Sequence, residues 1–177
     1  MSPIGPITHV VIHYSATYPD QNLTAADIDR MHRARTPPFR CIGYHLFIRR
    51  DGSVETGRTE TEQGAHVIGQ NAGKIGICWA GGLERDSGAH VGVNNMAPTQ
   101  EESLIRLIRD LRERYPGAKV VGHRDLAPTQ CPGFDVIPWW AEIERAQAEA
   151  LAGADQPTPA AWLARVWRTA SRVLGRT

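Results

Sequence analysis

Two kinds of apolar pattern alternate along the chain: short runs rich in β-branched residues, and longer stretches with apolar residues at helical spacing. The short runs predict strands, at residues 7–13, 44–50, 53–56, 75–80 and 119–122. The longer stretches predict helices, at residues 24–35, 99–115 and 137–151. Because strands and helices alternate, we expect an α/β fold, a single domain in which helices flank a central mixed β-sheet.

Turn and capping residues refine these boundaries. Asp51 and Gly52 form a tight-turn signal, which predicts a hairpin between the second and third strands. Thr24 can cap the first helix through its hydroxyl. Thr99 and Glu102 predict a capping box at the start of the second helix, because the two residues are three positions apart.

The C-terminal segment differs from the rest of the chain. Residues 1–152 are expected to form the domain, and residues 153–177 a linker followed by an extra amphipathic helix at 158–175. The segment after residue 152 contains four arginines and one aspartate, and its tryptophans, leucines and valines share the helical face opposite the arginines. This helix either packs back on the domain or lies at a membrane surface, where its arginines bind anionic lipid or lipopolysaccharide.

Composition excludes several classes of protein. Hydrophobic residues make up 41% of the 177 residues and charged residues 22%, so the chain can bury a core. No apolar run reaches about 18 residues, which excludes a transmembrane helix, and the N-terminus lacks the pattern of a signal peptide. Three cysteines without a CxxC pair fit a reducing cytoplasm. The net charge is only +1 and no broad basic surface is expected, so we expect no nucleic-acid partner.

Two of the seven histidines, His13 and His123, stand at the ends of predicted strands. In open α/β sheets, functional groups gather at strand ends. Cys131 lies eight residues after His123, in the loop that follows the same strand. Two imidazoles and a thiolate would suit a catalytic zinc ion with one open position. The spacing leaves a second interpretation open, in which the two histidines and the thiol are simply buried.

Several motifs occur in an order that resembles a known enzyme family. They are HYSAT (13–17), IGYHLFI (42–48), DGSVETGR (51–58), GAH (64–66), Asn71 with IGI (75–77), and HRDLAPTQCPG (123–133). Together they resemble the type-2 N-acetylmuramoyl-L-alanine amidases, a family that includes the peptidoglycan recognition proteins. The similarity is strongest to small phage lysozymes that are zinc amidases, and it extends from about residue 7 to residue 140.

The resemblance implies a zinc ion (Zn2+) bound by His13, His123 and Cys131. Such a ligand set leaves one position open, where zinc lowers the pKa of a bound water to roughly 7. The resulting hydroxide would attack the amide that joins the lactyl group of N-acetylmuramic acid to L-alanine of the stem peptide. Bacterial peptidoglycan is therefore the expected partner, and we expect the protein to be a monomer.

The resemblance also implies two catalytic residues, Tyr44 and Thr129. Tyr44 matches the family's active-site tyrosine, which would hydrogen-bond the water or the developing oxyanion. From the residues alone, the alternative for Tyr44 is a strand aromatic that packs on a helix. Thr129 stands where the phage lysozymes have lysine, so its hydroxyl can donate a hydrogen bond but brings no positive charge. Cys78 occupies a position that is glutamate in some branches, so an acidic general base is absent there.

His66 and Asn71 lie in the loop that resembles the family's substrate groove. They either bind the muramyl or peptide part of the substrate or fix the glycine-rich loop through hydrogen bonds. We expect His45 to be structural, because in a regular strand it points to the face opposite Tyr44.

These features favour a zinc-dependent peptidoglycan amidase that acts as a phage or prophage endolysin and lyses the host. Such a protein would be made in the host cytoplasm and reach the periplasm and cell wall after the membrane is permeabilised. Two alternatives remain: a recognition module that binds muropeptides without cutting them, and a regulator that binds another protein. The small phage lysozymes also inhibit the RNA polymerase of their phage, but these motifs define no surface for that function.

Overall fold

Five strands form one mixed sheet in the computed structural model, which describes residues 4–85 and 91–154. The strands are β1 (His9–Tyr14), β2 (Leu46–Ile48), β3 (Val54–Thr56), β4 (Lys74–Trp79) and β5 (Lys119–Gly122), in the order β3-β2-β4-β1-β5. Strands β2, β4, β1 and β5 run parallel, and β3 pairs antiparallel with β2 as the expected hairpin. The helices are α1 (Ala25–Arg33), α2 (Pro98–Arg114) and α3 (Val136–Ala154), and a 3₁₀ turn, η1 (His123–Asp125), follows β5. The expected α/β fold is therefore confirmed.

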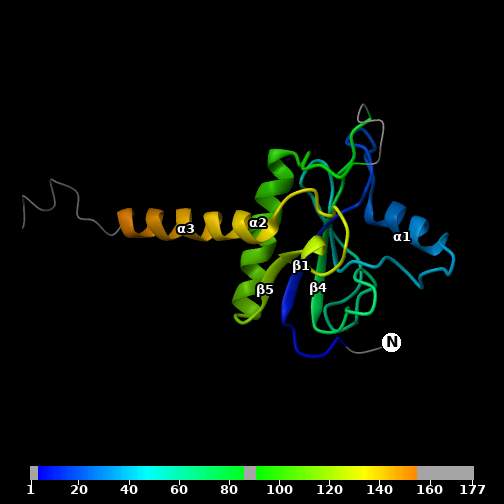
Figure 1. Cartoon of the computed structure of the whole chain (residues 1–177), viewed down its shortest axis with the longest axis horizontal. Coiled ribbons are helices and arrows are strands. Elements are labelled where there is room, and N and C mark those ends of the chain that lie inside the picture. The colour runs from blue at the N-terminus through cyan, green and yellow to red at the C-terminus, as the bar shows by residue number, and fades with distance from the viewer. Residues whose placement is uncertain (1–3, 86–90, 155–177) are drawn as a thin grey trace, which may run out of the picture. The chain divides into compact units, whose positions relative to one another are not determined.

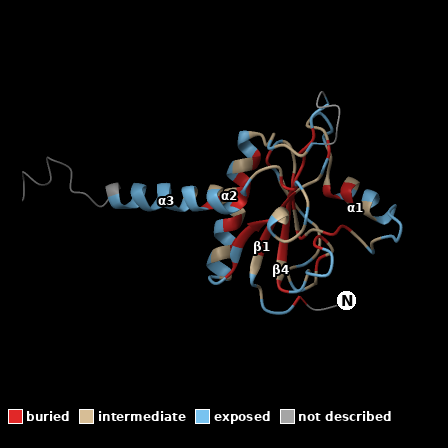
Figure 2. Cartoon of the chain, in the orientation of Figure 1, coloured by how far each residue is buried: buried red, intermediate tan, exposed pale blue. Residues whose placement is uncertain are grey.

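Strand β1 lies between β4 and β5, and its residues 10–12 are fully buried. Both faces of the strand are covered, which is why it is a continuous apolar run in the sequence. His13 pairs with Cys78 of β4, so both side chains point to the same face of the sheet. Ile28 of α1 belongs to the buried cluster that contains Cys78, so α1 covers this face. In Figure 1, α2 lies on the other side of the strands, and Figure 2 shows the buried strands between the two helices.

Helix α1 begins where the sequence predicts. The hydroxyl of Thr24 accepts a hydrogen bond from the N–H of Asp27 at 3.2 Å, and the Asp27 carboxylate accepts one from the N–H of Thr24 at 2.8 Å. The helix ends at Arg33, two residues before the expected end. His32 lies in the last turn, four residues after Ile28, so it belongs to the helical face that covers the sheet.

The predicted capping box of the second helix is wrong. Helix α2 begins at Pro98, with Ala97 as its N-cap, and not at Thr99. The side chain that reaches back to the cap is Gln100 rather than Glu102, because the carboxamide oxygen of Gln100 accepts the N–H of Ala97 at 3.0 Å. Proline explains the difference, since its fixed φ and missing N–H suit the first position of a helix.

The segment before β2 is hydrogen-bonded although it is not part of the regular strand. The structure limits β2 to three residues, whereas residues 44–50 were expected to be extended. The carbonyl groups of Tyr44 and His45 accept hydrogen bonds from the N–H groups of Arg58 and Gly57, at 2.9 and 2.8 Å. These bonds hold Tyr44 and His45 in place at the edge of the sheet.

Helix α3 continues three residues past its expected end at residue 151. The sheet, α1 and α2 belong to one unit that ends at Ile137, and a second unit begins at Pro138. Residues 141–152 are exposed, apart from the half-buried Ile143. The expected basic helix at 158–175 lies outside the described residues, so both interpretations of it, and the boundary after residue 152, stay predictions. Within the described ranges, no helix is long and apolar enough to cross a membrane.

Candidate metal centre and active site

Three side chains meet at the carboxyl ends of β1 and β5. His13 is the fifth residue of β1, His123 follows β5 as the first residue of η1, and Cys131 lies in the loop after η1. Their candidate ligand atoms all lie within 4.8 Å of one another. The two imidazole centroids are 4.6 Å apart, and His13 Nδ1 is 3.7 Å from Cys131 Sγ. The structure thus brings together the three residues that the sequence singled out as ligands, because adjacent parallel strands end at one edge of the sheet.

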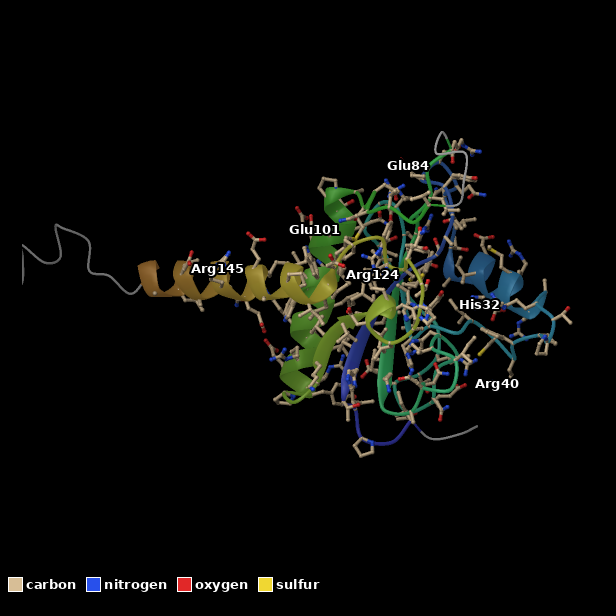
Figure 3. All side chains as sticks on the ribbon, viewed as in Figure 1. His32, Arg40, Glu84, Glu101, Arg124 and Arg145 are labelled. Carbon is tan, nitrogen blue, oxygen red and sulfur yellow. The ribbon has the colours of Figure 1, made fainter. Side chains whose placement is uncertain are left out.

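The loop after β5 is held by Arg124, which is labelled in Figure 3. The backbone N–H of Arg124 donates to the carbonyl oxygen of Cys131 at 2.8 Å. The Arg124 guanidinium donates to the carbonyl oxygen of Gln130 at 2.6 Å and pairs with the Asp135 carboxylate at 2.8 Å. The backbone N–H of Tyr14 donates to Cys131 Sγ at 3.3 Å. These contacts keep the sulfur buried beside the two imidazole rings.

Burial sets the protonation of the three groups. It lowers the pKa of His13 well below its usual value, with further lowering by His66 and His123, and it also lowers the pKa of His123. Both rings are therefore neutral at pH 7, with a lone pair for a metal ion. Burial raises the pKa of Cys131 to about 12, so a bound cation is what would hold this sulfur as a thiolate.

The donor set fits zinc. Two neutral imidazoles and a thiol that a cation can deprotonate are the ligand types of a catalytic zinc site. Among the residues that the structure describes, no further histidine, cysteine or carboxylate belongs to this cluster. Three protein ligands leave a fourth, tetrahedral position for water or substrate.

A cavity of about 320 Å³ opens beside the candidate metal ligands. His123 lines it, together with Tyr44, His66 and Asn71, so four residues predicted from the sequence surround one space. Arg35 is the permanently charged side chain in this lining, and none of the described residues of the lining is acidic. A cavity of this size next to a metal centre can hold part of an extended substrate.

Tyr44 both packs on the domain and faces the metal centre. Its ring contacts the cluster that α1 forms with the sheet, and its centroid is 5.2 Å from that of His13. Burial raises the pKa of Tyr44 well above its usual value, and Cys78 and Cys131 raise it further. The phenol is therefore protonated at neutral pH and can act as a hydrogen-bond donor.

Thr129 lies next to the metal centre but outside the lining of the cavity. Its hydroxyl oxygen accepts the N–H of Cys131 at 3.3 Å. The hydroxyl hydrogen is not used in that bond, so it is available for a second hydrogen bond, and the catalytic role of Thr129 stays a prediction.

The hydrogen bonds of His66 and Asn71 are with other parts of the protein. The side-chain oxygen of Asn71 accepts the N–H groups of His66 and Val67, at 2.8 and 2.9 Å, and so fixes the loop. His66 Nδ1 lies 3.0 Å from His13 Nε2, and both side chains are buried. Binding of substrate by either residue stays a prediction, whereas the fixing of the loop is visible in these contacts.

The lining residues of the cavity that sequence reasoning missed include His32, Arg35 and Phe39. His32 had a signal, because its spacing from Ile28 places it on the buried face of α1. Arg35 had none, since it lies in the irregular turn after the helix, where its guanidinium carbon is 5.1 Å from the centroid of the Phe39 ring.

Comparisons with known proteins show the family of this chain. Residues 3–134 match the family model described as N-acetylmuramoyl-L-alanine amidase. The endolysins of Enterobacteria phage T3 and Escherichia phage T7 are each 38% identical to this chain over 135 residues, covering 76% of it and 86% of the endolysin.

Two solved structures have folds similar to that of this chain. The N-acetylmuramoyl-L-alanine amidase LysC from Clostridium intestinale URNW has a TM-score of 0.65 and 29% identity, covering 84% of this chain and 93% of LysC. The bumblebee protein PGRP-SA has a TM-score of 0.62 at 23% identity, covering 78% of this chain and 86% of its own, which indicates a shared fold. The chain therefore belongs to the N-acetylmuramoyl-L-alanine amidase family, close to the phage endolysins, and it is an enzyme of that class.

Proposed function

We propose that this amidase depends on zinc, cleaves the bond between N-acetylmuramic acid and L-alanine in peptidoglycan, and acts as a phage or prophage endolysin. The observation that carries the proposal is the convergence of His13, His123 and Cys131 within 4.8 Å. The role in lysis is supported by the relatives at 38% identity, which are phage endolysins. When bound at these residues, zinc would supply a Lewis acid that activates water near neutral pH.

The residues around the centre then bind the substrate and stabilise charge. Tyr44 donates a hydrogen bond from its protonated hydroxyl to the attacking water or to the developing oxyanion. Thr129 offers a second hydroxyl from the loop that carries Cys131. The cavity beside His123 accommodates the muramyl or peptide part, with Asn71 at its edge.

Digestion of purified sacculi tests this proposal. Wild-type protein should release stem peptides that begin at L-alanine, detected by mass spectrometry, and should contain about one zinc ion per chain. His123→Ala should lose both properties, because it removes one of the three ligands. Lys119→Ala is the matched control, since it changes the other end of β5 and should leave both properties intact. A wild-type protein that binds sacculi but releases no peptide would instead indicate a recognition module.

We further propose that the enzyme is made in the host cytoplasm and reaches the wall after the membrane is permeabilised, and that residues 153–177 assist by binding anionic lipid or lipopolysaccharide. The charge of that segment supports the second part, with four arginines against one aspartate. Deletion of residues 157–177 should then reduce lysis of intact cells far more than hydrolysis of purified peptidoglycan. Equal losses in the two assays would indicate a structural segment.

A further inference from the structure

The ring of His13 has partners on both of its nitrogen atoms. Nδ1 faces the candidate metal position, 3.7 Å from Cys131 Sγ. Nε2 lies 3.0 Å from Nδ1 of His66, in a buried contact between residues that are 53 positions apart in the sequence. A neutral imidazole carries one hydrogen, so the partner of Nε2 decides whether Nδ1 keeps a free lone pair.

The second nitrogen of His66 determines the direction of this hydrogen bond. His66 Nε2 lies 3.4 Å from the carbonyl oxygen of Lys74, which can only accept. The His66 side chain is buried, and a neutral imidazole carries a single hydrogen. Its hydrogen is therefore on Nε2, and its Nδ1 is an acceptor. His13 must then donate from Nε2, which leaves His13 Nδ1 without a hydrogen.

Two glycines clamp the ring of His66. A Cβ atom at Gly64 would lie 2.4 Å from Cδ2 of His66, and one at Gly76 would lie 2.7 Å from the same atom. Both positions therefore need glycine for the ring to fit. The His45 ring stands edge-on to the ring of His66, with centroids 5.7 Å apart. The ring is held between backbone atoms and a second imidazole, so it has little freedom to turn.

His45 is fixed, as expected of a structural residue, but it does not point away from Tyr44, because the centroids of the two rings lie 5.7 and 6.4 Å from that of His66. His45 Nδ1 accepts the N–H of Gly76 at 2.9 Å, so its Nε2 carries the hydrogen and donates to the carbonyl oxygen of Glu62 at 3.0 Å. The side-chain oxygen of Asn71 accepts the backbone N–H of His66. The glycines of the GAH motif and of β4 thus confine a single imidazole against His13, whereas Asn71 fixes only the loop backbone.

We propose that His66 is a positioning residue for the metal centre: it holds His13 in the tautomer whose Nδ1 is free to bind zinc. This inference rests on the proposed zinc site. Loss of a partner that orients a ligating histidine in this way typically lowers metal affinity about 10- to 100-fold. The role differs from binding of substrate, because it acts on the affinity for zinc even when no substrate is present.

Zinc affinity of three variants of the full chain tests the proposal, measured by competition with a chromophoric chelator. His66→Leu removes the acceptor and should weaken zinc binding about 10- to 100-fold. His66→Asn places an amide oxygen where Nδ1 was, so it should recover most of that loss. Asn71→Ala is the control for a loosened loop, because it removes the hydrogen bonds to the loop backbone but leaves the acceptor for His13.

The outcomes separate this inference from the proposed function. Equal affinity of wild type and His66→Leu would overturn the role of His66, and so would equal weakening by His66→Leu and Asn71→Ala. Failure of the wild type to bind zinc would instead overturn the proposed zinc site. Long-range ¹H–¹⁵N spectra of the zinc-free protein give a second test that needs no metal. They should show His13 protonated at Nε2 in the wild type, and protonation at Nδ1 would contradict the proposal.

Discussion

The two ends of β1 each carry a histidine, but the structure places only His13 among candidate metal ligands. His9, at the amino end, pairs with Lys74 of β4 and Lys119 of β5. His13, at the carboxyl end, pairs with Cys78 and is buried. Four residues along one strand therefore separate two different environments for the same side chain.

The difference shows that position in the sheet, rather than residue type, decides which histidine lies among the candidate metal ligands. Partial burial lowers the pKa of His9, and the charges of Lys74 and Lys119 lower it further. The same two charges would also repel a metal cation. At the carboxyl end, the loop after β5 instead adds a second imidazole and a sulfur.

Alanine substitution of the histidine at each end of β1 tests this contrast. The substitution at the carboxyl end should have the largest effect of all the changes predicted here. His13→Ala should lower amidase activity by at least about a thousandfold and abolish zinc binding, since the metal contributes several kcal/mol to the transition state. His9→Ala should change neither property appreciably. Activity on purified peptidoglycan and zinc content by mass spectrometry give the comparison. Similar losses in both variants would refute the asymmetry.

Removal of one hydroxyl should have the next largest effect. Tyr44→Phe keeps the ring that packs on the α1 cluster and beside His13 but loses the hydroxyl that we propose as a donor. We expect kcat to fall about 100- to 1000-fold, as it does when one oxyanion donor is removed elsewhere. Zinc content should stay at the wild-type level. Unchanged turnover would leave only the packing role for this tyrosine.

The smallest predicted effect concerns stability and pH. Burial lowers the pKa of His45, Arg58 lowers it further, and the Glu62 carbonyl and the charges of Glu60 and Glu62 oppose the shift. Below about pH 6.5 the unfolded chain therefore binds a proton that the folded chain does not. The free energy of unfolding therefore decreases as the pH is lowered. The contribution of His45 is at most about 1.4 kcal/mol per pH unit.

Urea unfolding of the zinc-free protein at pH 7, 6 and 5 would measure this slope. His45→Gln should flatten it, because glutamine does not titrate. The remaining buried histidines still titrate in the variant, so the comparison is between two slopes and not with zero. Identical slopes for the two proteins would mean that His45 does not contribute.

Much of the fold could be predicted because it depends on local pattern. The apolar run of β1 and the hydroxyl cap of α1 at Thr24 act over a few residues, and both are observed. The start of α2 was mispredicted because two capping patterns overlap there. Thr99 and Glu102 have the right spacing, but Pro98 selects the earlier start.

The site likewise contains residues that could be predicted from the sequence and residues that could not. His13 and His123 could be predicted as neighbours, because the carboxyl ends of parallel strands meet at one edge. Tyr44 required a family resemblance, since an aromatic residue near a strand ordinarily packs in the core. The contact between His66 and His13 could not be predicted, because it depends on the path of an irregular loop across the sheet. No local pattern describes that path.

X-ray absorption at the zinc edge of the purified, full-length protein tests the central claim most directly. We predict about one zinc ion per chain, with two histidine nitrogen ligands near 2.0–2.1 Å, one sulfur near 2.3 Å and one further light atom. The Cys131→Ser variant should lose the sulfur signal and keep the nitrogen signal if it still binds the ion. A wild-type spectrum without sulfur, or a protein that binds no zinc, would contradict the account.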